Sequence, residues 1–141
     1  MDDSLRVGAD SLTQLGNHWA ARLTTYRRDG TPVSTPVNVA VDRGRVFFRT
    51  YEQAGKFKRL RNNPEVDVAP SDARGRPTGP STRAVARLLN GGDDRLAATL
   101  VDRKHRVFQG ILIRLAHRLR GYTTRHFELL PPSNAAAGQS D

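Results

Sequence analysis

The sequence predicts a mainly β fold with peripheral helices, and in particular one small β-barrel whose ends are covered by helices. Segments rich in Val, Thr, Phe and Tyr alternate with turns spaced by roughly ten residues, as in barrels and sandwiches. The expected order is a helix, three strands, a helix, two strands, two helices and one strand. A chain of 141 residues suits one domain with its own core. We expect that domain over residues 1–131 and a disordered tail over residues 132–141, which has little to bury.

The first half begins with a weak helical segment and continues as an antiparallel meander. The helical segment, ADSLTQLGNHWA, has Asp10 or Ser11 as a possible cap. The strands that follow read AARLTTYRR, VSTPVNVAV and RVFFRTY. The first turn contains Asp29-Gly30, a pair that suits the positive φ angles of a tight hairpin.

The middle of the chain predicts a short helix between strands. Ala54, Phe57 and Leu60 recur every three residues and form one apolar helix face. Asn63-Pro64 ends this helix, because proline disfavours helical geometry in the residue before it. The strands EVDVAP and STRAVARLLN follow, joined by the turn-rich segment SDARGRPTGP.

The second half predicts two helices and a final strand. The helix GGDDRLAATLVDRKHR has Asp93 or Asp94 as its cap, with Leu96, Leu100 and Val101 turned inward. The amphipathic segment VFQGILIRLAHRLRG is expected to cover the barrel or pack in a dimer rather than bind a membrane surface. The strand YTTRHFELL stops at two prolines.

Composition limits the classes of function. The formal net charge of +9 favours a polyanionic partner or ligand. The absence of cysteine excludes disulfides and thiolate metal sites, and the four histidines lack the spacing of metal ligands. No GxSxG motif supports acyl transfer. Without a signal peptide or an apolar run near ~18 residues, we expect a soluble cytoplasmic protein with no membrane association.

The stretch GKFKRLRNNPEV contains four cations in six consecutive positions. Lys56 lies near the first turn of the predicted helix, where the helix dipole favours an anion. Arg61 lies at the edge of the apolar face, where a buried guanidinium needs an anionic partner. Lys58 projects elsewhere and is expected to be solvated. Lys56, Arg61 and Arg49 are therefore predicted to form a phosphate-sized site.

Three motifs carry a resemblance to a known family: STPV at 34–37, GK followed by RLRNNP, and APSDARGRPTG. With their order and spacing, the chain from about Trp19 to Leu130 resembles the split-barrel flavin and deazaflavin oxidoreductases related to pyridoxamine 5′-phosphate oxidase. It is most similar to their actinobacterial branch of coenzyme F420-dependent enzymes. Trp19 itself is expected to be a core residue.

The resemblance implies a six-stranded split β-barrel of the FMN-binding type, which dimerises with two cofactor sites along the subunit interface. The cofactor that the resemblance implies is coenzyme F420, with FMN as the alternative. The implied cofactor-binding residues lie in or directly after these motifs and in the strand at 45–51: Thr35, Pro36, Val37, Asn38, Arg49, Thr50, Lys56, Arg61, Pro70 and Ser71. Asn38 departs from the aromatic residue of many relatives, which changes one wall of the ring-facing or substrate-facing pocket.

The implied reaction is hydride transfer from the reduced deazaflavin to a small conjugated organic acceptor. Because the cofactor carries the chemistry, no side chain is assigned a catalytic role. Three alternatives remain: an FMN-dependent oxidase or reductase of the same fold, a barrel that binds the cofactor without turnover, and a basic nucleic-acid-binding module. The last is disfavoured, although Arg114, Arg118 and Arg120 add charge, because stacking aromatics are few and no recognition motif is present.

Overall fold

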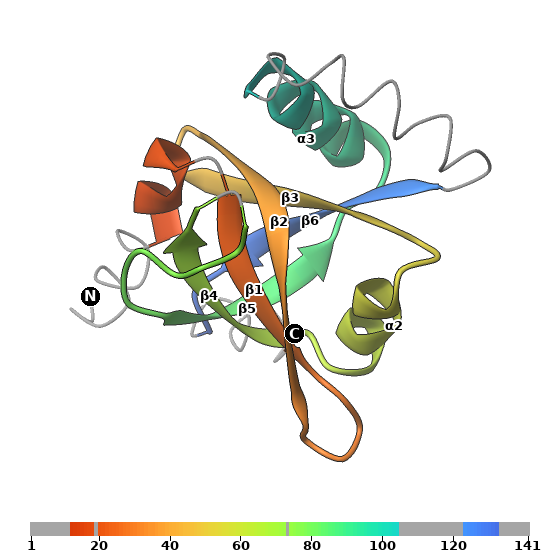
Figure 1. Ribbon diagram of the computed structural model, residues 1–141. Coiled ribbons are helices and arrows are strands. Elements are labelled where there is room, and N and C mark those ends of the chain that lie inside the picture. Colours follow the sequence, from red (N-terminus) through yellow and green to blue (C-terminus); the bar gives the residue numbers. More distant parts are fainter. Residues whose placement is uncertain (1–11, 19, 73, 105–122, 133–141) are drawn as a thin grey trace.

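A computed structural model describes residues 12–18, 20–72, 74–104 and 123–132. Within them, six strands form a closed barrel in the order β1-β2-β3-β6-β5-β4, and every neighbouring pair is antiparallel (Figure 1). The strands are β1 (Ala20–Tyr26), β2 (Pro32–Asp42), β3 (Arg45–Tyr51), β4 (Glu65–Ser71), β5 (Thr82–Leu88) and β6 (Thr124–Leu130). The helices are the 3-10 helix η1 (Gln14–Asn17), α2 (Gly55–Asn62) and α3 (Gly91–Lys104). The predicted mainly β fold is confirmed.

Two hairpins form in the first half, the first of them at the predicted Asp29-Gly30 turn. In the β1–β2 turn Gly30 has φ +89°, and the Arg27 amide donates to the Thr31 carbonyl at 2.9 Å. In the β2–β3 turn Arg43 and Gly44 both have positive φ, 51° and 79°, which matches the twist of the flanking strands. Gly30 and Gly44 adopt the left-handed region without a Cβ clash.

The core fills the barrel because inward side chains alternate along every strand. Phe48 of β3 stacks on Phe127 of β6 with ring centroids 5.2 Å apart, and Phe57 of α2 meets Phe127 edge-on at 6.0 Å. Leu60, also on α2, is only 3% exposed. Burial of both α2 side chains explains why this short, cationic helix is stable against the barrel.

The barrel is split along one side. β2 pairs with β1 through residues 32–38 but with β3 only through residues 39–42. The end of β3, residues 49–51, pairs with β6 alone. The first half of β2 and the last part of β3 therefore diverge, and α2 packs against β1 and β3 at this end of the barrel (Figure 1).

Helix α3 packs on the outside of the barrel against β2, β3 and β6. Phe47, Leu89 and Ala97 form a second apolar cluster there. Two predictions about this helix were wrong. It begins at Gly91, so Asp93 and Asp94 lie in its first turn and do not cap it, and Leu96 is 38% exposed. Val101 is buried and Leu100 packs against the apolar cluster, as predicted, and Ala97 completes this face.

Several predictions fall outside the described residues. They concern the helix at 107–121 with its three arginines, Trp19, the caps Asp10 and Ser11, and the tail beyond Pro132. No helix in the described ranges is long and apolar enough to cross a membrane.

Candidate functional site

Lys56 lies in the first turn of α2, beside the split. The helix follows Ala54, whose extended backbone provides no side-chain cap, and no acidic residue occupies the first turn. The half-buried Lys56 places its Nζ 3.4 Å from the backbone carbonyl oxygen of Pro36 on β2. The amine therefore faces the STPV segment.

Arg59 lies beside Lys56 and is the second cation of this site. Its Nε donates to the buried hydroxyl of Thr25 at 2.7 Å. Its Nη1 folds back over Gly55, where an added Cβ would lie 2.9 Å away. Burial, and then the nearby charge of Arg59, lower the pKa of Lys56 to about 8. We call Lys56 and Arg59 the cation pair.

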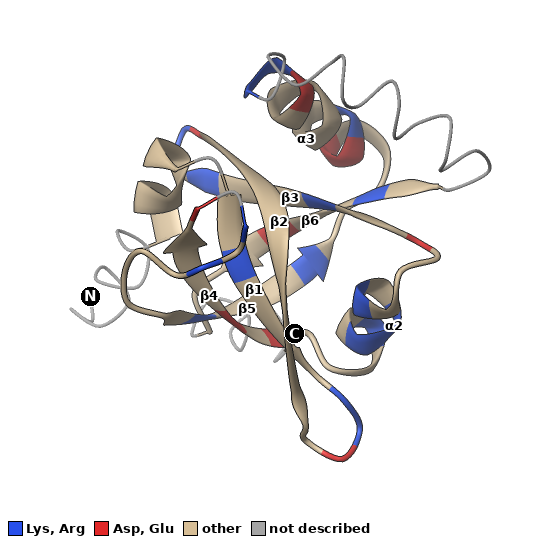
Figure 2. Ribbon diagram, viewed as in Figure 1, with Lys and Arg blue, Asp and Glu red and all other residues tan. Residues whose placement is uncertain are grey.

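The cation pair has no anionic partner in the described part of the chain. The ion pairs there involve other arginines or His126, and none reaches any of the four cations of α2. The pKa of Arg59 is lowered mainly by burial and, to a smaller extent, by the positive charge of Arg27 in the β1–β2 turn. Figure 2 shows this concentration of Lys and Arg on α2 and on the neighbouring turn. A phosphate would relieve the repulsion between these cations.

Thr35, next to Pro36 on β2, contributes a buried polar atom. Its side chain faces the barrel opposite Leu23 of β1, and its Oγ1 is buried with no hydrogen-bond partner among the described residues. A buried hydroxyl without a partner costs about 1–3 kcal/mol. Together with the cation pair, this hydroxyl fits a ligand that has both a polar ring and a phosphate.

The other residues implied by the motifs occupy different environments. Val37, Thr50 and Ser71 are buried, Pro36 and Asn38 are exposed, and Pro70 is half-buried. β1 brings two of the motifs together, because Arg22 pairs with Pro36 on one side and Ala21 pairs with Pro70 on the other. The loop after β4 also reaches Pro36, since a Cβ on Gly75 would lie 3.4 Å from its ring.

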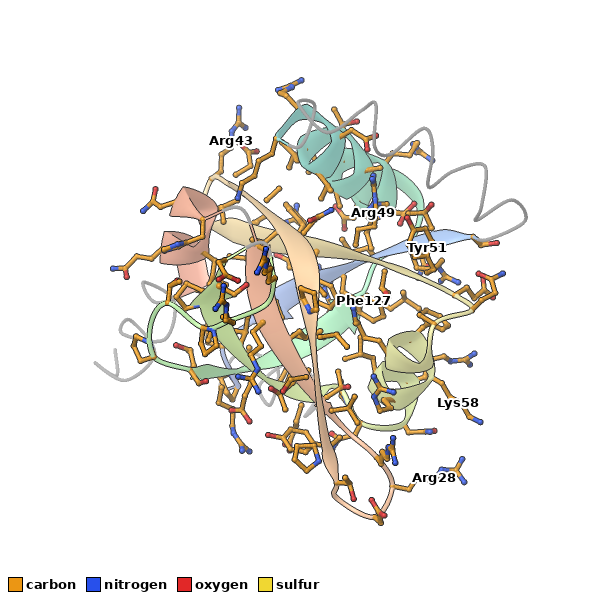
Figure 3. The ribbon with its side chains drawn as sticks, viewed as in Figure 1. Arg28, Arg43, Arg49, Tyr51, Lys58 and Phe127 are labelled. Carbon is orange, nitrogen blue, oxygen red and sulfur yellow. The ribbon has the colours of Figure 1, made fainter. Side chains whose placement is uncertain are left out.

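Two members of the predicted phosphate site lie elsewhere. Arg49 points from β3 toward α3, away from α2 (Figure 3). Its Nη2 lies 2.8 Å from Asp102, so its charge is already paired. Arg61 is exposed, which contradicts the expected burial, and its guanidinium lies 6.0 Å from the Phe57 ring. The structure therefore assembles Lys56 with Arg59. The helical wheel places these two residues on one side of the helix, but Arg59 is not among the residues predicted for the phosphate site.

A buried histidine holds α3 to the barrel. His126 accepts a hydrogen bond at Nε2 from Arg49 Nε at 3.0 Å, so its Nδ1 carries the proton that it donates to Asp94 at 2.9 Å. Burial lowers the pKa of His126, and the hydrogen bond to Asp94 opposes this. The role of His126 is therefore structural. No group of side chains that could hold a metal ion occurs in the described ranges.

Two cavities lie at the η1 end of the barrel, and Lys56 lines neither. One has a volume of about 70 Å³ and the other, more open, about 220 Å³. The first is lined by Gln14, Leu15, His18, Val68, Pro70, Pro80 and Thr82. Both are smaller than the roughly 300–1,000 Å³ of ordinary ligand pockets.

Known proteins share this fold. A search of curated proteins gave no match. The heme binding protein from Mycobacterium smegmatis is 15% identical with a TM-score of 0.57, over 92% of this chain but only 51% of that one, so the chain spans about half its length. A putative pyridoxamine 5′-phosphate oxidase from Listeria innocua is 15% identical with a TM-score of 0.54, over 89% and 94% of the two chains. A putative 5-nitroimidazole antibiotic resistance protein from Bacteroides thetaiotaomicron is 11% identical with a TM-score of 0.57, over 92% and 78%.

These likenesses concern the fold, whereas the family follows from the sequence itself. The family model described as pyridoxamine 5′-phosphate oxidase matches residues 11–117, which is most of the chain and includes the split, α2 and the loop after β4. The chain therefore belongs to the pyridoxamine 5′-phosphate oxidase family.

Proposed function

We propose that this protein is a coenzyme F420-dependent oxidoreductase that transfers a hydride from the reduced deazaflavin to a small conjugated organic acceptor. Members of the family bind flavins, and many are oxidoreductases. The observation that carries the proposal is the cation pair, Lys56 and Arg59, which has no carboxylate partner in the described ranges. Such a pair suits the phosphodiester of F420.

The surrounding charge favours F420 over FMN. FMN has one phosphate, which the cation pair alone would neutralise. Lys58 and Arg61 on α2 and Arg27 on the adjoining turn extend the positive surface beyond the pair. The oligoglutamate tail of F420 adds carboxylates that such a surface would attract.

The chain's own residues would bind and orient the cofactor. Lys56 and Arg59 would hold the phosphate, and the Thr35 hydroxyl would meet a polar atom of the ring. The bound deazaflavin supplies the hydride, while the protein supplies position and excludes water. No side chain needs to act as a nucleophile.

We also propose that the protein is a homodimer, with a second copy completing each site along the split. The described cavities lie away from Lys56, and the exposed Asn38 leaves the β2 side of the split open to a partner. Sedimentation with cofactor bound tests this directly. A monomer at micromolar concentration would contradict it.

Fluorescence titration of F420 into folded variants tests the function. Lys56→Ala should weaken binding roughly tenfold or more, since a charge-assisted hydrogen bond contributes about 1.5–3 kcal/mol. Arg59→Gln should resemble it. Lys58→Ala is the matched control, because Lys58 carries the same charge on the same helix but is exposed, so its loss should be smaller and more sensitive to salt.

Two outcomes would overturn the proposal. Equal, salt-sensitive losses for Lys56→Ala and Lys58→Ala would make α2 a diffuse cationic surface and favour a nucleic-acid ligand. Tight FMN binding without F420 binding would favour the FMN-dependent alternative, whose single phosphate also suits the cation pair. Addition of hemin to the same protein tests heme binding, the property named for the mycobacterial structure.

A further inference from the structure

The amine of Lys56 is unusual among the lysines of this chain. The sequence contains only three, at positions 56, 58 and 104. Lys104 donates at 2.6 Å to the carbonyl oxygen of His18, and Lys58 is exposed on the far side of α2 (Figure 3). Lys56 is half-buried, and its contact with the Pro36 carbonyl is long, at 3.4 Å. It is thus partly desolvated but weakly bound.

Its surroundings favour the neutral, nucleophilic form. Burial and the charge of Arg59 lower the pKa of Lys56 to about 8, so roughly half of the amine is unprotonated at pH 8. Desolvation next to a second cation is the arrangement that activates lysines for imine formation. No carboxylate in the described ranges counteracts it.

Arg59 provides an anchor beside this amine. Its guanidinium is fixed by the Thr25 hydroxyl at 2.7 Å and by its position over Gly55, so little side-chain freedom is lost when it binds an anion. The two remaining guanidinium nitrogens match the geometry of a phosphate. The site thus combines a phosphate-binding group with an amine three residues earlier on the same helix.

We propose that Lys56 forms an imine with aldehydes that carry a phosphate group, and that Arg59 binds the phosphate. The lone pair of the neutral amine attacks the carbonyl carbon, and a C–N bond forms. The two protons of the amine nitrogen pass to the former carbonyl oxygen, which leaves as water. The product is a C=N bond with no change in oxidation state, so no oxidant or reductant is required.

The test compares two aldehydes that differ by the phosphate. Pyridoxal 5′-phosphate and pyridoxal are suitable probes, because their imines absorb in the visible and are trapped by borohydride. Cofactor-free protein is incubated with each at pH 8, reduced, digested and analysed by mass spectrometry at the three lysines. With the phosphorylated probe, Lys56 should be labelled about tenfold faster than Lys58, as one charge-assisted contact allows.

Arg59→Gln separates the anchor from the amine. We expect this variant, checked for folding by its unfolding midpoint, to lose the preference for the phosphorylated probe while Lys56 remains the preferred lysine with pyridoxal. Lys56→Met should abolish the visible imine band. Equal labelling of Lys56 and Lys58, or an unchanged preference in Arg59→Gln, would overturn the proposal.

This inference uses the same cation pair as the proposed function but does not require the deazaflavin. Labelling of Lys56 in a protein that binds no F420 would refute only the proposed function. Binding of F420 that depends on Lys56, without selective labelling, would refute only the imine. If both hold, saturating F420 should protect Lys56 from the aldehyde.

Discussion

Glu128 is a buried carboxylate whose neutralisation should destabilise the protein measurably. It lies on β6, is 5% exposed, and accepts hydrogen bonds at 3.0 Å from both Nε and Nη2 of Arg45 and at 2.6 Å from Arg87. Burial alone would raise its pKa, but the hydrogen bonds from the two arginines outweigh burial, so the pKa of Glu128 is lowered. The carboxylate thus favours the folded state as the anion.

Glu128→Gln preserves the shape but removes the charge, and it places an amide NH₂ against a guanidinium. Removing one partner of a buried ion pair costs about 3–5 kcal/mol. Here the side chains of Arg45 and Arg87 are 34% and 53% exposed and regain water, so the expected loss lies lower, at about 2–3 kcal/mol. For a chain of this size that lowers the melting temperature by roughly 5–12 °C.

Urea unfolding measures the loss, with Glu52→Gln as the control. Glu52 pairs with Arg125 at 3.7 Å, and its side chain is 45% exposed, so its replacement should cost less than about 1 kcal/mol. Because the folded pKa of Glu128 is lowered, its contribution is complete above the unfolded pKa of about 4.3 and is lost as the pH falls through the folded pKa. Equal losses for the two variants, or a difference that persists unchanged below both pKa values, would refute this reasoning.

Two further predictions concern α3 and the β2–β3 turn. The pKa of His126 is lowered in the folded state, so the unfolded chain binds a proton at a higher pH than the folded protein does. The free energy of unfolding should therefore fall as the pH drops below about 6.5. His126→Gln should flatten this slope, as measured by urea midpoints between pH 8 and 5.5. Gly44→Ala should lower the free energy of unfolding by roughly 1–2 kcal/mol, because Gly44 has φ +79°. Gly92, in the first turn of α3, has an ordinary φ, so Gly92→Ala should be neutral or stabilising. Thermal melts of both variants measure the difference. A neutral Gly44→Ala would show that this turn relaxes to another type.

Local patterns in the sequence are sufficient to predict the elements of the barrel. The segment RVFFRTY coincides with β3, and Asp29-Gly30 forms the first hairpin. The apolar spacing of Phe57 and Leu60 correctly predicted α2 and its buried face. These features depend on backbone preferences and on side-chain periodicity within a few residues, so they can be read from the chain locally.

Which cations share a site depends on long-range packing. Alternation of side chains along β3 places Arg49 on the outer face of the barrel. Helix α3 covers that face and supplies Asp102, which pairs with Arg49. The strand alone does not show whether the outer face meets solvent, a cofactor or a helix. The choice of Arg59 over Arg61 depends on Thr25, which lies 34 residues away along the chain and is brought to α2 by the β1–β2 hairpin. A helical wheel gives the direction of a side chain but not the element opposite it, because long-range strand pairing sets that element.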